Sequence, residues 1–126
     1  MAGHTPRQPT VLIAVADTTA LAGLAIAAGA DLIDTTGLGD QAVAAVRARH
    51  PDARLWAGSP AAAGADVGAG GRTLPVAAVV ARAAVLTWLG TPAIRTRHVL
   101  PVRRAIDMTS SIAGTRLPSF TTRGLG

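Results

Sequence analysis

Two aspartates end the first two apolar runs of the chain, and a threonine follows each of them. The runs read "TVLIAVADT" and "DLIDT", so that Asp17-Thr18 and Asp34-Thr35 stand at matching positions. An ionised carboxylate accepts two N–H bonds in one plane, which suits a heterocycle edge with adjacent N–H donors. Aspartate is also a favoured helix cap. The pattern therefore leaves two interpretations open, a paired binding site and two structural caps.

The segments around these aspartates have the pattern of alternating strands and helices. Apolar runs of strand length occur at 10–16, 31–34, 54–57 and 93–96. Helical spacing of apolar residues, with cap and stop signals, predicts helices at 19–28, 42–49, 76–89 and 100–112. Thr18 or Thr19 is the expected cap of the first helix and Asp40 that of the second. This order predicts an α/β fold with about four parallel strands and right-handed crossovers.

The predicted topology places Asp17 and Asp34 at the same end of the sheet. In parallel α/β folds the ligand site lies beyond the carboxyl ends of the strands, where polar side chains from several strands converge. Asp17 and Asp34 both follow such ends. In the last helix, Val102, Ile106 and Ile112 are expected to face the core.

Three stretches interrupt this rhythm and set the predicted domain organisation. Residues 1–9 are polar with two prolines, and we expect them to be disordered. Residues 58–74 hold five glycines and no strand-length apolar run, which predicts a Gly/Ala-rich linker inside the α/β domain of residues 10–113. Residues 114–126 lack periodicity and are expected to form a flexible basic tail.

The charge of the chain is concentrated at its C-terminal end. Residues 1–94 contain six Arg and six Asp, whereas residues 95–126 contain six Arg and only Asp107, so this end carries the whole formal charge of +5. Such a cluster suits phosphates or an acidic partner, although charge runs are usually solvated faces. Because no aromatic residues are interleaved with the arginines, nucleic acid is not an expected partner.

Composition excludes several other classes of site. The chain has no Cys, which rules out disulfides and thiolate metal sites, and its three His are too scattered to suggest a metal site. We expect neither a signal peptide nor a membrane span, because no charged region precedes an apolar run and no apolar run reaches membrane length. These features favour a cytoplasmic location and no membrane partner.

Two segments of the chain resemble the dihydropteroate synthases and related pterin-binding barrels. Residues 13–50 read "IAVADTTALAGLAIAAGADLIDTTGLGDQAVAAVRARH" and are similar to the middle of that family, where an Asp-Thr strand end leads through an "A-x-x-A-G-A-D" helix end into "I-N-D-x-[ST]-G". Residues 90–108, "GTPAIRTRHVLPVRRAIDM", resemble its closing Arg-x-His-Asp-Val signature. The resemblance implies a partial TIM-barrel-like (β/α) unit and a function in folate biosynthesis.

The resemblance also assigns roles to individual residues. Asp17 matches the family's pterin-contacting aspartate, and Asp34 falls where the family has an asparagine that binds the pterin edge. Arg95 matches the arginine of the closing strand, which helps to hold the anionic ligand. Arg97 and His98, at the family's His and Asp positions, are candidate anion-binding residues. "ADVGAGG" resembles the family's "D-P-G-x-G-F" loop, which would make Asp66 a further pterin ligand.

Several family features are missing from this chain. The family's first strand, with its Asn-x-Thr loop, has no counterpart before Thr10, and its Ser-x-Lys motif is impossible without lysine. Those parts hold the pyrophosphate group, so the transfer of a pterin to aminobenzoate, and the Mg²⁺ that the resemblance implies, lack their usual support. We therefore expect pterin binding with impaired catalysis.

A partial barrel also has consequences for association. An open set of barrel strands has two unpaired edges, which favours a homo-oligomer or a partner protein. Two functions from different classes remain as expectations. One is a dihydropteroate-synthase-like pterin-binding protein, and the other is a non-catalytic binding or assembly subunit that acts through its Arg-rich C-terminal part.

Overall fold

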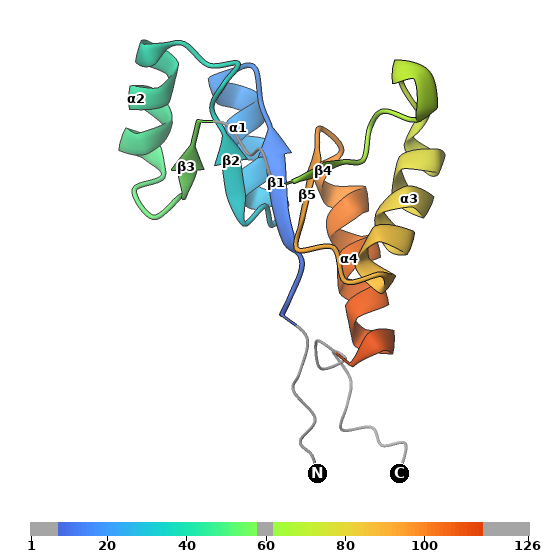
Figure 1. Cartoon of the computed structure of the whole chain (residues 1–126). Coiled ribbons are helices and arrows are strands. Elements are labelled where there is room, and N and C mark those ends of the chain that lie inside the picture. Colours follow the sequence, from blue (N-terminus) through green and yellow to red (C-terminus); the bar gives the residue numbers. More distant parts are fainter. Residues whose placement is uncertain (1–7, 58–61, 115–126) are drawn as a thin grey trace.

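A parallel sheet with helices between its strands confirms the expected α/β fold (Figure 1). The computed structural model describes residues 8–57 and 62–114. Within these residues the sheet has five strands in the order β3-β2-β1-β5-β4, all parallel. In chain order they are β1 (Val11–Val15), β2 (Leu32–Asp34), β3 (Leu55–Trp56), β4 (Ala63–Gly64) and β5 (Ala93–Thr96).

In the described residues, three α-helices and one 3-10 turn lie between successive strands, and a fourth α-helix follows the last strand. The helices are α1 (Thr19–Ala27), α2 (Asp40–Arg49), α3 (Val76–Trp88) and α4 (Val99–Ala113), and the 3-10 turn η1 covers Ala69–Gly71. None of the helices in the described part of the chain is long and apolar enough to cross a membrane.

The strand missed by the sequence analysis is β4, a two-residue strand in the segment predicted as a linker. It pairs with β5, and Ala65 directly after it is fully buried in the core. Leu74, farther along the segment, packs against the same core. A strand of two residues is too short to show an apolar periodicity, and the glycines and alanines around it have the composition of a linker. The sequence therefore carries no signal for this strand.

The strand register separates two faces of the sheet. Leu12, Ala14, Ile33 and Ile94 share one face and belong to the hydrophobic core, to which all four α-helices contribute. Residues on alternate positions, such as Ile13, Asp34 and Arg95, lie on the other face because successive strand residues point to opposite sides. Ile13 is nevertheless buried.

The strand order is that of successive strands around a barrel which is open between β3 and β4. The steps from β1 to β2, from β2 to β3 and from β4 to β5 all move in the same direction along the sheet. Right-handed crossovers that move in one direction place their helices on one face. This explains why the four helices contribute to a single core.

Most helix boundaries follow the expected signals, with one correction at the start of α2. Thr18 caps α1 through its Oγ1, which accepts a bond of 3.1 Å from the Leu21 N–H. The predicted cap of α2 is wrong by one residue, because Gly39 is the cap and Asp40 is the first helical residue. Asp40 there still favours the helix, since a negative charge in the first turn complements the helix dipole.

The expected inward face of α4 is correct except at its end. Val102 and Ile106 are buried, whereas Ile112 is 70% exposed. Ile112 lies near the C-terminus of α4, where Gly114 ends the helix in the left-handed conformation (φ 83°). The inward line of the helix instead continues through Ser110, which is buried.

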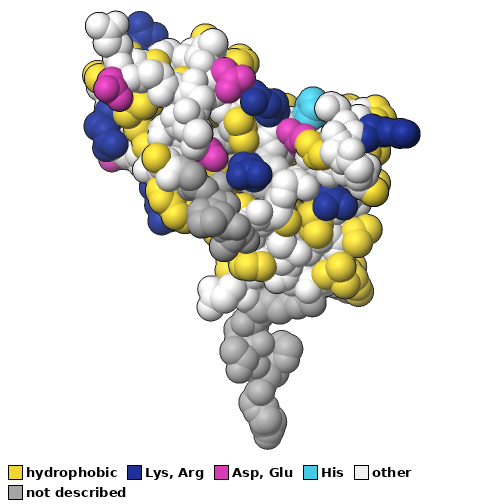
Figure 2. All heavy atoms as spheres, turned by 45° about the horizontal axis from the view of Figure 1, so that its top comes forward, with side chains coloured by type: hydrophobic (Ala, Val, Ile, Leu, Met, Phe, Trp, Pro, Cys, Tyr) yellow, Lys and Arg dark blue, Asp and Glu magenta, His cyan; other side chains and the backbone are white. Residues whose placement is uncertain are grey.

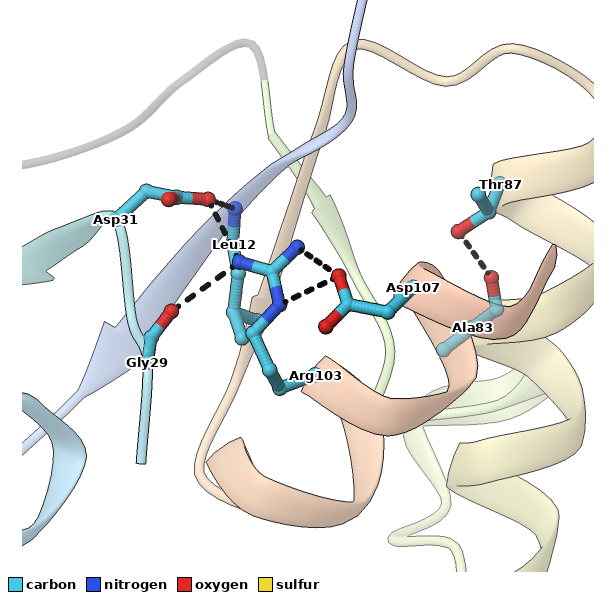
Figure 3. A network of polar contacts seen from close by, with 7 residues as sticks. All are labelled: Leu12, Gly29, Asp31, Ala83, Thr87, Arg103 and Asp107. Atoms are coloured by element: carbon cyan, nitrogen blue, oxygen red, sulfur yellow. Dashed lines mark hydrogen bonds and ion pairs between the residues drawn. The ribbon is translucent and has the colours of Figure 1, made fainter. Parts of the chain in front are cut away.

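A group of contacts around Arg103, here called the arginine clasp, joins three elements at the N-terminal ends of the strands (Figure 3). We call this end of the sheet the amino edge. Arg103 of α4 donates from Nη1 to the Gly29 carbonyl at 3.1 Å and to Asp31 Oδ2 at 3.0 Å. Its Nε donates to Asp107 Oδ1 at 3.1 Å, one turn farther along α4. Asp31 Oδ2 also accepts from the Leu12 N–H of β1 at 2.8 Å. The clasp therefore ties α4 to the start of the two central strands.

Candidate functional site

A hollow of about 370 Å³ lies at the C-terminal ends of the strands. We call this end of the sheet the carboxyl edge. Four of the six residues expected at a site line it, namely Asp34, Asp66, Arg95 and Arg97. They come from β2, from the turn after β4 and from the end of β5. Figure 2 looks partly onto this edge, where basic and acidic side chains are interspersed.

The register explains why Asp34 and Arg95 reach the same hollow. Asp34 pairs with Val15, and Arg95 pairs with Ile13 and Gly64. Val15 and Ile13 are two residues apart on β1 and so point to the same side of the sheet. Asp34 and Arg95 therefore flank β1 on the face opposite the helical layer.

A local turn fixes the carboxylate of Asp34. Its Oδ1 accepts from the Thr36 N–H at 2.9 Å and from the Thr36 hydroxyl at 2.6 Å. This is an Asx-type turn, in which an aspartate bonds to the backbone two residues later. Asp34 is only 5% exposed, so the turn holds a buried carboxylate at the wall of the hollow.

Asp66 acts as a brace between two strand ends. Its Oδ1 accepts from the Thr96 hydroxyl at 2.5 Å, and its Oδ2 accepts from the Arg97 N–H at 2.8 Å. The Thr96 hydroxyl in turn accepts from the His98 N–H at 2.9 Å. These bonds position the backbone from which the Arg97 side chain extends.

Asp17 reaches the hollow only through Arg97. Arg97 Nη1 donates to Asp17 Oδ2 at 2.6 Å, and the two side chains are 54% and 49% exposed. Asp17 itself is not among the residues that line the hollow. The ion pair joins the end of β5 to the end of the neighbouring β1.

The backbone of Gly37 lies close to the other carboxylate oxygen of Asp17, Oδ1. A Cβ atom added at Gly37 would lie 2.5 Å from Asp17 Oδ1. Only glycine therefore fits at this position without displacing the Asp17 carboxylate or the turn after β2.

The remaining expected residues differ in their placement. Arg95 is partly buried, and its Nη2 lies near Gly64 across the β4–β5 pair. His98 is the N-cap residue of α4, and it is not among the lining residues of the hollow. The contact found for His98 comes from its backbone, which is why its residue type alone was a poor guide.

Thr36, Thr96 and Gly37 are structural partners that the sequence analysis did not single out. Thr36 could have been found from the Asp-x-Thr spacing that favours an Asx-type turn. Thr96 and Gly37 act through contacts with residues far away in the chain. No local pattern marks such contacts.

The carboxylates do not form a cluster suited to a resident Mg²⁺. In residues 8–57 and 62–114, no group of three or more His, Cys, Asp or Glu side chains could hold a metal ion. Asp17, Asp34 and Asp66 each have separate polar partners.

Comparisons with known proteins add no family to this geometry. No protein-family model matches the chain, and neither the curated proteins nor the solved structures contain a match.

Proposed function

We propose that the hollow at the carboxyl edge binds a small heterocycle of the pterin type. The observation that supports this most directly is the convergence of Asp34, Asp66, Arg95 and Arg97 on one hollow of about 370 Å³. This size suits a flat two-ring ligand rather than a large substrate, since ligand pockets usually span about 300–1,000 Å³. The resemblance to pterin-binding barrels predicted these four residues together with Asp17 and His98, which do not line the hollow.

In the proposed complex, different polar groups contact different parts of the ligand. Asp34 lines the hollow, and its carboxylate can accept N–H bonds, as the amino-pyrimidine edge of a pterin requires. Arg95 and Arg97 supply guanidinium groups that suit an anionic substituent, because their planar donors match carboxylates and phosphates. Asp66 and Thr96 position the backbone of Arg97 through the bonds that Asp66 accepts from the Thr96 hydroxyl and the Arg97 N–H.

The proposed activity is binding without efficient group transfer. Loss of pyrophosphate from a pterin ester requires strong positive charge where the leaving group departs. The chain has no lysine, and Arg97 is already paired with Asp17 at 2.6 Å. A transferase reaction between a pterin ester and aminobenzoate would therefore be slow at best.

Calorimetric titration tests the proposal directly. Purified protein is titrated with a hydroxymethyl pterin and with its pyrophosphate ester. Asp34→Ala and Arg95→Ala are compared with Asp52→Ala and Arg104→Ala, which remove the same charges from exposed positions away from the hollow. We expect binding by the wild type, a loss of about tenfold or more in both hollow variants, and unchanged affinity in the controls.

Two controls keep this experiment decisive. Circular dichroism and thermal melting verify that each variant is folded at the temperature of titration. Arg95→Ala should lower the affinity for the pyrophosphate ester more than the affinity for the free pterin, because only the ester carries the anionic group. The absence of binding by the folded wild type, or equal losses in hollow and control variants, would refute a pterin site.

A further inference from the structure

Asp17 differs from the other aspartates of the carboxyl edge in its place and in its partner. It follows the fully buried Ala16, directly after β1, and precedes Thr18, the cap of α1. The Gly37 backbone lies against its Oδ1, and its Oδ2 accepts from Arg97 Nη1 at 2.6 Å. The buried strand end, the helix cap and one ion pair therefore hold this carboxylate beside the hollow, although it does not line the hollow.

The charged side chains that line the hollow balance one another. In the described part of the chain, two are the carboxylates Asp34 and Asp66, and two are the guanidinium groups of Arg95 and Arg97. Asp17 adds a third carboxylate, in direct contact with Arg97. Counted together with Asp17, these groups carry one more negative charge than positive charges.

The exposure of the Arg97–Asp17 pair determines how it responds to a ligand. Both side chains are about half exposed, so water reaches the pair and little free energy opposes an exchange of partners. A phosphate group that binds Arg97 must compete with Asp17 for the guanidinium, and it must also lie near a carboxylate of the same charge. An uncharged heterocycle that binds to Asp34 meets neither cost.

We propose that Asp17 is a specificity-determining residue that lowers the affinity of the hollow for phosphorylated ligands and so shifts its preference toward the uncharged pterin. The inference rests on the proposed pterin site and deepens it, because it names the class of ligand that the site prefers. In this role Asp17 is an internal counter-ion of Arg97. The resemblance to pterin-binding barrels instead assigned to Asp17 a direct contact with the ligand.

Calorimetric titration of the full chain with inorganic pyrophosphate tests this role without a pterin. Asp17→Asn keeps the shape of the side chain and removes its charge. At low salt this variant should bind pyrophosphate about fivefold more tightly than the wild type, because the competing like charge is gone. About 0.3 M salt should reduce the gain to less than twofold, since exposed charges are then screened within about 6 Å.

Two further variants separate the charge of Asp17 from other effects. Asp52→Asn removes an exposed carboxylate away from the hollow and should bind pyrophosphate like the wild type. The double variant Asp17→Asn/Arg97→Gln should bind pyrophosphate no more tightly than the wild type, because Arg97 is the group that the loss of Asp17 releases. Thermal melting verifies that each variant is folded at the temperature of titration.

A comparison of two ligands tests the specificity itself. In Asp17→Asn, the ratio of the affinity for the pyrophosphate ester to the affinity for free hydroxymethyl pterin should rise about fivefold over the wild-type ratio. In Asp52→Asn this ratio should stay unchanged.

The pterin site and the role of Asp17 would fail in different ways. A folded wild type that binds no pterin, together with a gain in pyrophosphate affinity in Asp17→Asn, would refute the pterin site and still support the exclusion of phosphorylated ligands by Asp17. The role of Asp17 would be overturned by a folded Asp17→Asn variant without that gain, by an equal gain in Asp52→Asn, or by a gain that persists in the double variant.

Discussion

Two arginine–aspartate contacts at opposite edges of the same sheet have different surroundings. At the amino edge, Arg103 is 19% exposed and contacts Gly29, Asp31 and Asp107. At the carboxyl edge, the Arg97 side chain is 54% exposed and its guanidinium pairs with Asp17. Partly buried ionic bonds with several partners contribute to stability, whereas an exposed single pair contributes little.

The difference follows from what each edge must do. The amino edge joins strand starts to the helical layer, and the clasp closes it with bonds to backbone and side chains. The carboxyl edge holds the hollow, where the proposed ligand would need accessible polar groups. We infer that the contacts important for stability are concentrated at the first edge, and we propose the second edge as the binding site.

The largest expected effect comes from breaking the clasp. Arg103→Ala removes the bonds to Gly29, Asp31 and Asp107 and should lower the free energy of unfolding by about 2–3 kcal/mol. The melting temperature should fall by roughly 10 °C. Arg104→Ala changes the adjacent exposed arginine and should alter stability by less than about 0.5 kcal/mol. Urea unfolding measures both, and similar small effects would contradict the assigned role of the clasp.

A smaller effect is expected at the brace of the carboxyl edge. Thr96→Val keeps the shape of a side chain that is 1% exposed but removes the hydroxyl that bonds Asp66 and the His98 N–H. The free energy of unfolding should decrease by about 1–2 kcal/mol. Thr73→Val, at an exposed position, is the control and should be near neutral. A stability unchanged by Thr96→Val would show that the brace is dispensable.

The smallest effect on stability should come from the exposed pair. A double-mutant cycle with Asp17→Ala and Arg97→Ala should give a coupling energy of about 0.2–1 kcal/mol. About 1 M salt should reduce it toward zero, because the screening length is then only about 3 Å. A coupling energy of several kcal/mol that persists in high salt would contradict the inference that the Arg97–Asp17 pair contributes less to stability than the Arg103 contacts.

Much of the fold was predictable because strong local patterns specify it. The continuous apolar run of β1 and the helical spacing of α3 and α4 identified their elements correctly. Strand β4 was missed because two residues between glycines and alanines carry no periodic signal. The cap of α2 was displaced by one residue, since Gly39 and Asp40 are both acceptable in that position.

The candidate site was predictable as a set of residues but not as a geometry. Parallel topology predicted that strand-end residues converge, and Asp34, Asp66, Arg95 and Arg97 do line one hollow. The sequence offered no way to foresee that Asp17 joins this site only through Arg97. That contact links positions 80 residues apart in the chain.

The sequence by itself determined the order of strands and helices, because hydrophobic periodicity and capping act over a few residues. It also determined which polar residues follow the strands. Only the tertiary structure decided the strand order across the sheet and the partners of Arg97 and Arg103. These depend on which distant segments pack together, since register and burial are set by contacts between elements rather than within them.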